Sequence, residues 1–242
     1  MHLRVISVAP VLASLVLTAV ALSASPASAV EPKSYQLTRL NLPDNSRPVV
    51  RWNPCQSALT YKVNVAGLAG TAAKRSAIRV TKASVARVAR GTGMRFAYRG
   101  KTRMVPRKNN LARQSVADIV VAFVRPAKTD YPLAGSTAGY GGWQAVYAER
   151  PDGRYRAAIA RGFIVIDQPQ TKHWPNGLDR GGVTRANLIS HELGHAVGLS
   201  HVPDPRQLMS PTLTNKAPAG FAAGDRAGLT KVGRSAGCIH GL

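Results

Sequence analysis

The stretch SHELGHAVGLSH, residues Ser190–His201, constrains this chain more than any other short segment. His191 and His195 are four residues apart, so on a helix both imidazoles project from the same face. On a continued helix His201 would point away from them. Gly198 removes this difficulty, because glycine tolerates the left-handed backbone that ends a helix and turns the chain back. The sequence therefore predicts that the three histidines converge on one point.

Three imidazoles at one point can hold a zinc ion, with nitrogen–zinc distances of about 2.0–2.1 Å and a fourth position open for water. Glu192 follows the first histidine and can reach such a water. Asp204 is the nearby acidic competitor of His201 for the third ligand position. No glutamate competes, because the chain has only Glu31, Glu149 and Glu192. The pattern predicts a metal centre with a carboxylate beside it.

This string, HExxHxxGxxH, resembles the signature of the metzincin metallopeptidases. The matching residues are His191, Glu192, His195, Gly198 and His201. Met209, eight residues after the third histidine, is placed like the Met-turn that supports the zinc site in that family.

Within the metzincins, the chain is most similar to the matrixins and their small secreted bacterial relatives. The segments that carry this wider similarity are Ala117–Ile119 before an apolar strand, Phe163–Asp167 followed by Trp174, and Gly224–Asp225 at the start of the last helix. The chain lacks the cysteine segment that keeps matrixin zymogens latent, and calcium sites are not assigned.

The resemblance implies a zinc-dependent endopeptidase that acts on proteins or peptides. Zinc would be held by His191, His195 and His201, and Glu192 would be the catalytic general base. An edge strand near Ser136–Gly142 would pair with an extended substrate. The loop Pro211–Ala223, with Leu213 and Phe221, would line the primary specificity pocket.

Apolar periodicity and glycine breaks predict one mixed α/β domain. Expected strands cover residues 59–65, 94–98, 116–124 and 162–167, and expected helices cover 71–90, 185–197 (capped by Thr184) and 224–232. The glycine-rich segment 126–143 is typical of a long loop with one short strand. The resemblance makes this a metzincin-type α+β catalytic domain with a twisted, mostly parallel sheet, two long helices and a C-terminal helix.

The chain opens with Arg4, an apolar run over residues 5–22 and small residues that end at Ala29. This order is typical of a signal peptide over residues 1–29, and the alternative is an uncleaved membrane anchor. An extended lead-in over residues 30–52 and the metallopeptidase domain over 53–242 follow. We expect a secreted, extracellular and monomeric protein with no membrane span after signal cleavage.

Cys55 and Cys238 are the two cysteines of the chain. An even count in an exported protein predicts a disulfide that ties the start of the domain to its end. The alternative, Cys55 as a free thiolate that masks a metal, has no support in the residues around it.

The formal net charge of the chain is +22 at pH 7. Such a charge favours contact with acidic wall or surface polymers, although it also serves solubility alone. The sequence does not contain the combination of aromatic and basic residues that is typical of nucleic-acid-binding proteins, so specific nucleic-acid binding is not expected. The alternative function is therefore a basic adhesion protein that binds acidic polymers and has a structural zinc.

Overall fold

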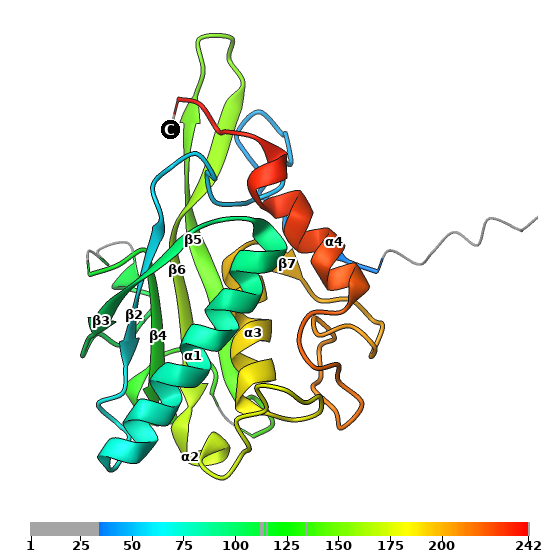
Figure 1. The fold of residues 1–242 in the computed structure, drawn as a ribbon. Coiled ribbons are helices and arrows are strands. Elements are labelled where there is room, and N and C mark those ends of the chain that lie inside the picture. Colours follow the sequence, from blue (N-terminus) through cyan, green and yellow to red (C-terminus); the bar gives the residue numbers. More distant parts are fainter. Residues whose placement is uncertain (1–33, 112–113, 115, 134, 242) are drawn as a thin grey trace, which may run out of the picture. The chain divides into compact units, whose positions relative to one another are not determined.

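A five-stranded sheet forms the centre of the fold (Figure 1). Its strands are β2 (Leu59–Asn64), β3 (Phe96–Lys101), β4 (Ile119–Val124), β5 (Gly139–Glu149) and β6 (Tyr155–Asp167), arranged in the order β3-β2-β4-β6-β5. The first four strands in that order pair in parallel, and β5 runs antiparallel to β6. The predicted mixed, mostly parallel sheet is confirmed.

The computed structural model describes residues 34–111, 114, 116–133 and 135–241. The predicted signal peptide and the first residues of the lead-in lie outside these ranges. Within the described ranges, no helix combines the length and apolar character that a membrane crossing requires.

Two helices, α1 (Thr71–Thr92) and α3 (Arg185–Ala196), lie side by side against one face of the sheet. The two glycines after residue 90 predict a helix stop at Gly91 and Gly93, and Gly93 does end α1, with φ 68°, whereas the helix continues through Gly91 to Thr92. Gly91 is glycine for packing: a Cβ there would lie 2.5 Å from Leu229. Leu229 belongs to the C-terminal helix α4 (Ala223–Val232), which packs against α1.

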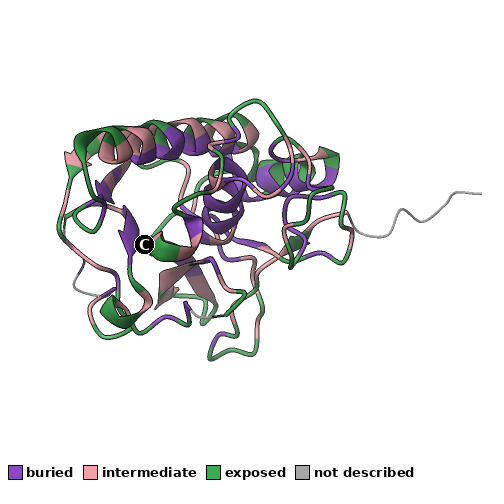
Figure 2. Cartoon of the chain, turned by 90° about the horizontal axis from the view of Figure 1, so that it is seen from below, coloured by how far each residue is buried: buried purple, intermediate pink, exposed green. Residues whose placement is uncertain are grey.

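The main core lies between the sheet and these helices, and the buried residues, purple in Figure 2, are on the sides of the helices that face the sheet. A second, smaller apolar cluster covers the opposite face of the sheet. There Leu111, Tyr131 and Leu133 from the connecting segments pack on Phe163 and Val165 of β6. The sheet is thus buried on both faces, which explains why β4 is apolar throughout.

Strand β5 corrects the prediction that residues 126–143 form a long loop with one short strand. Eleven residues, Gly139–Glu149, pair with β6, which itself starts at Tyr155 rather than at residue 162. The glycines of β5 do not break the strand; they let it pass close to α3. A Cβ at Gly141 would lie 2.2 Å from the backbone oxygen of Glu192.

The described part of the lead-in, from residue 34 onward, packs on the end of α3 and the segment that follows it. Strand β1 (Gln36–Leu37) pairs antiparallel with β7 (Leu199–Ser200), directly after α3. The buried indole of Trp52 donates a 2.9 Å hydrogen bond to the carbonyl of Ala196 at the end of α3. The remaining short elements are η2 (Pro126–Lys128), α2 (Gln168–Thr171) and η3 (Arg234–Ala236).

The predicted disulfide between Cys55 and Cys238 is present, with Cα atoms 5.3 Å apart across a sequence separation of 183 residues. Asn53 adds two hydrogen bonds to the same junction, because its side chain donates to the carbonyl of Ile239 and accepts from the Ile239 amide. The end of the chain is therefore fixed to the start of the sheet domain.

Candidate metal centre

Helix α3 carries the first two histidines of the motif and is buried along almost its whole length (Figure 2). Thr184 caps it, because its hydroxyl accepts a 3.1 Å hydrogen bond from the amide of Asn187. Such a cap satisfies one of the amides that a helix start leaves unpaired. A buried, capped helix holds His191 and His195 on fixed backbone.

Gly198 makes the turn that follows α3. Its φ is 109°, a conformation that side chains other than glycine rarely adopt, and its amide donates to the carbonyl of His195. A Cβ at Gly198 would also lie 2.3 Å from the backbone oxygen of Val50. The turn leads through β7 to His201, which comes back to the side of α3 that bears the other two histidines.

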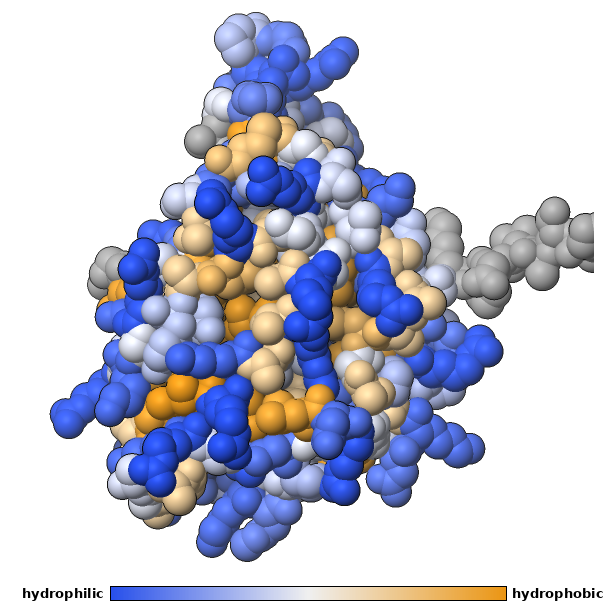
Figure 3. Space-filling model, in the orientation of Figure 1, coloured by the Kyte–Doolittle hydropathy of each residue, from blue (hydrophilic) through white to orange (hydrophobic). Residues whose placement is uncertain are grey.

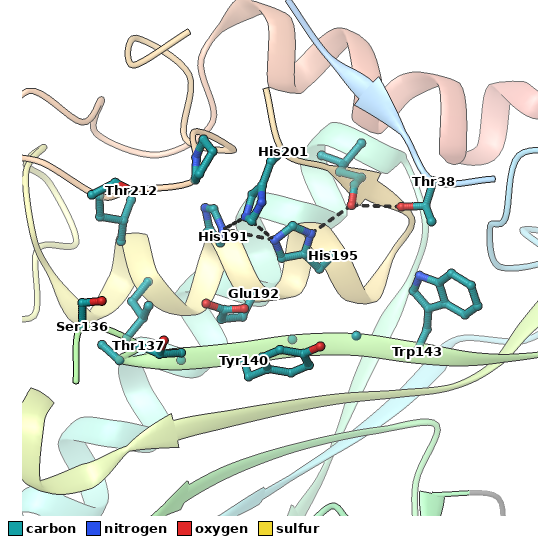
Figure 4. A pocket seen from close by; sticks show the side chains of 18 of the residues that line it. Thr38, Ser136, Thr137, Tyr140, Trp143, His191, Glu192, His195, His201 and Thr212 are labelled. Carbon is teal, nitrogen blue, oxygen red and sulfur yellow. Dashed lines mark hydrogen bonds between the residues drawn. The ribbon is translucent and has the colours of Figure 1, made fainter. Parts of the chain in front are cut away.

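The three imidazoles converge (Figure 4). The Nε2 atom of His191 lies 3.1 Å from that of His195 and 3.1 Å from that of His201, and the His195–His201 distance is 3.0 Å. Asp204, the alternative third ligand, instead forms a 3.0 Å ion pair with Arg206. Its carboxylate is not part of the histidine group.

The hydrogen bonds on the far side of the rings show that this cluster fits a metal ion. Nδ1 of His191 lies 2.7 Å from the carbonyl oxygen of Leu208, and Nδ1 of His195 lies 3.0 Å from that of Leu199. A carbonyl only accepts, so each Nδ1 carries the proton and each Nε2 offers a lone pair. Lone pairs that face one another at 3.0–3.1 Å match ligands of one zinc, which are about 3.3 Å apart at tetrahedral angles.

The electrostatics of the rings agree with a role as neutral ligands. Burial, together with the neighbouring His195, lowers the pKa of His191 to about 3. Burial and His201 lower the pKa of His195 to about 4, and burial lowers that of His201. All three imidazoles therefore favour the neutral form that binds metal.

Glu192 lies between the histidines and strand β5 (Figure 4). Its side chain is buried, and burial raises the pKa of its carboxyl to about 8, against a backbone hydrogen bond from Gly141 that lowers it. A cation held by the histidines would oppose this rise. Gly139 leaves room for the carboxylate, since a Cβ there would lie 2.9 Å from Oε1 of Glu192.

Met209 and Asp225 pack around the segment that contacts His191. Met209 is buried against α3, where a Cβ on Gly194 would lie 2.5 Å from its sulfur. The Asp225 carboxylate accepts hydrogen bonds from the amides of Leu208 at 2.6 Å, Met209 at 3.2 Å and Ala222 at 2.9 Å. Burial raises the pKa of Asp225, and these three amides oppose the rise.

A cleft with a volume of about 550 Å³ runs past the histidines and Glu192. The segments 136–143 and Pro211–Leu213 line it, together with Thr38 and Trp174. Of the two residues expected in the specificity pocket, Leu213 lines the cleft. Phe221 does not: it is buried in the main core, close to Gly194, because the loop folds back toward α3.

Thr38 and Asp225 contribute to the site in ways that the sequence did not indicate. The Thr38 hydroxyl donates to the Leu199 carbonyl at 3.3 Å, the same oxygen that accepts from His195. Asp225 acts through Leu208, which lies 17 residues earlier in the chain. Both contacts join segments that are distant in sequence, so no local pattern signals them.

A family model described as Matrixin matches residues 74–232, which is more than half of the 242-residue chain. The matched range includes most of α1, the sheet from β3 onward, the three histidines and α4. No curated protein gives a significant match to the chain.

Proposed function

Because the chain belongs to the matrixin family and holds the three-histidine site, it is a zinc metallopeptidase, and we propose that it is a secreted endopeptidase with Glu192 as its general base. The observation that carries this proposal is the position of Glu192. Its carboxylate is buried beside three converging histidines, and Glu192 lines the cleft of about 550 Å³ that runs past them. Protein or peptide chains are the expected substrates.

His191, His195 and His201 would hold the zinc, with Met209 beneath them. Zinc supplies Lewis-acid chemistry, because it lowers the pKa of a water molecule and polarises a carbonyl oxygen. Glu192 then accepts the proton of the attacking water at its carboxylate and passes it to the nitrogen of the leaving amine. Gly141 orients the carboxylate for both transfers through its amide.

Strand β5 supports cleavage within a chain rather than at its end. It is the edge strand of the sheet, next to the cleft, and it extends over eleven residues. An extended peptide can add to such an edge through main-chain hydrogen bonds that do not depend on its sequence. Because β5 continues beyond the cleft at Trp143, a substrate can run on past the site.

Export would follow from cleavage of a signal peptide after Ala29. The disulfide between Cys55 and Cys238 supports an extracellular location, because such bonds persist in oxidising surroundings. We expect the mature protein to act as a monomer.

The alternative of an adhesion protein with a structural zinc is less consistent with the site. Structural zinc sites are closed by four protein ligands. In the described residues the metal-binding group consists of three histidines, and Glu192 would have no task in a closed site.

The test is cleavage of casein and of proteome-derived peptides by Glu192→Gln, with Glu149→Gln as control. Glu149 is an exposed acid on β5, away from the histidines. We expect Glu192→Gln to retain zinc and lose at least about 100-fold in kcat, the scale of a lost general base. The control should cleave at the wild-type rate, with a zinc chelator abolishing that activity. Wild-type turnover by Glu192→Gln would reject the proposed base.

A further inference from the structure

The chain has no acidic residue between Asp44 and Asp118. This segment contains α1 and β3, and it carries a lysine or arginine about every fifth residue. Eight of the exposed cations in this segment form what we term the α1–β3 surface: Arg75, Arg79, Lys82 and Arg90 on α1, and Arg95, Arg99, Lys101 and Arg103 on or beside β3. Figure 3 shows strongly hydrophilic side chains among apolar ones on the face on which α1 lies.

Acids are missing from α1 even where they would stabilise it. Its first turn has no acid to complement the helix dipole, and Gly70 before it offers no side-chain cap. Arg75 and Arg79 are four residues apart, and Lys82 follows three residues later, so like charges are neighbours on one face. The helix therefore carries an electrostatic cost that mixed charges would avoid.

Two simpler explanations do not account for the surface. Cations on an edge strand block aggregation through the edges of sheets, and this would explain Arg99 and Lys101 on the edge strand β3. It does not explain the cations of α1, because a helix has no free strand edge. Solubility requires net charge, but it does not require the exclusion of every acid from the whole segment 45–117. Among the described residues the ion pairs are Arg150–Asp152 and Arg206–Asp204, and neither involves the surface.

We propose that the α1–β3 surface binds a linear polyol-phosphate polymer of a cell envelope, a partner that rests on the proposed export of the chain. Six of the eight cations are arginines, whose planar fork suits phosphate oxygens. From Arg75 to Arg90 the cations extend over about 22 Å of helix, which suits a chain of phosphates rather than one anion.

The surface lacks the aromatic platform on which the bases of single-stranded nucleic acid stack. The ring of Tyr98 on β3 is only partly exposed, and Lys82 covers it at 4.3 Å from the ring centre. A polymer without bases is therefore the better fit.

The position of the surface leaves the cleft free. β3 and β5 are the opposite edges of the sheet, separated by β2, β4 and β6. Four strand spacings place them about 19 Å apart. A polymer bound on α1 and β3 would hold the enzyme at an envelope while β5 stays open to substrate.

The experiment compares two sets of four substitutions in the full secreted chain. The first set changes Arg75, Arg79, Lys82 and Arg90 to Gln, which preserves helix propensity. The control set changes the exposed cations Arg125, Lys128, Lys172 and Lys231 to Gln, which removes the same charge elsewhere. Binding to poly(glycerol phosphate) is measured across salt concentrations, with duplex DNA and hyaluronate as competing polyanions.

We expect the first set to weaken binding at least 10-fold. The slope of the logarithm of the binding constant against the logarithm of the salt concentration should also become shallower, by an amount equal to about two to four fewer released counterions. The control set should change the affinity less than 3-fold. The first set should also melt at the same or a higher temperature than wild type, because it removes like-charge repulsion. Binding is read without turnover, so it is independent of the peptidase activity.

Three results would overturn the proposal. The first is no binding of wild type at 50 mM salt. The second is an equal loss in both sets, which would mean that charge acts without a defined surface. The third is tighter binding of DNA or hyaluronate than of poly(glycerol phosphate), which would assign the surface to another polymer.

Discussion

Nδ1 of His191 lies 2.7 Å from the carbonyl oxygen of Leu208. The amide of Leu208 donates in turn to Asp225 at 2.6 Å, so one residue connects an acid of α4 to a ring of the metal centre. This contact explains how a carboxylate that does not touch the histidines can orient one of them. The segment Leu208–Met209 thus has contacts on both sides, with α3 and with α4.

Asp225→Asn should therefore weaken zinc binding while the fold survives. The NH₂ group of the new asparagine would face backbone amides that donate hydrogen bonds to the carboxylate in the wild type. Loss of these bonds would loosen Leu208 and allow the His191 ring to turn. Loss of such an outer partner typically costs about 10–100-fold in metal affinity. Competition with a chelator measures this loss, and Asp179→Asn, at an exposed position, is the control. An unchanged zinc affinity in Asp225→Asn would show that the segment with Leu208 and Met209 keeps its position without the Asp225 carboxylate.

Thr38→Val should lower kcat several-fold with little change in KM. The substitution keeps the shape of the side chain but removes the hydroxyl that donates to the Leu199 carbonyl, the partner of His195. A hydrogen bond of this kind contributes about 0.5–1.5 kcal/mol. Thr38→Ser retains the hydroxyl and should restore the rate. If Ser and Val are equally impaired, Thr38 acts through packing alone.

Gly141→Ala should displace β5 from α3 and abolish most of the activity. Its Cβ would meet the Glu192 backbone at 2.2 Å, and relief requires movement of a strand or a helix. We expect a loss of about 2–3 kcal/mol in unfolding free energy, the scale of overpacking. Gly142→Ala is the matched control, because its Cβ meets only the Phe163 ring, at 3.0 Å. Denaturant unfolding measures the loss of stability in both variants, and a peptide cleavage assay measures their loss of activity.

The double variant Cys55→Ser, Cys238→Ser should unfold at a lower denaturant concentration. The bond closes a loop across 183 residues, and the loop-entropy account predicts a loss of about 3–5 kcal/mol. Asn53 still joins the two segments in the variant, so the folded structure should persist at 25 °C. A midpoint equal to that of the wild type would assign the stabilisation to Asn53 instead.

The sequence predicted the parts of this molecule that local spacing determines. Two histidines one helical turn apart, a glycine that permits a turn and a third histidine lead to the convergence that the structure has. The apolar strands β2 and β4 and the helices were also evident. These features depend on periodicity and on backbone conformation, which a short window of sequence contains.

The remaining features depend on contacts between distant segments. In the sequence, Gly139 and Gly141 look like loop residues and Gly91 looks like a helix stop. In the structure, the first two lie against α3 and the third lies against Leu229, so each leaves room for a neighbour. The lead-in resembled an extended arm, yet Thr38 borders the cleft. In each case a neighbour far away in the chain determines why the residue is there.

The most direct test of the central claim is the zinc content of the folded protein, measured by native mass spectrometry on wild type and on His201→Ala. We expect one zinc ion per wild-type chain and a large loss of zinc in the variant, and both chains should still be folded by circular dichroism. A folded wild-type chain without stoichiometric metal, or a variant that binds zinc as tightly as wild type, would contradict a centre built from all three imidazoles.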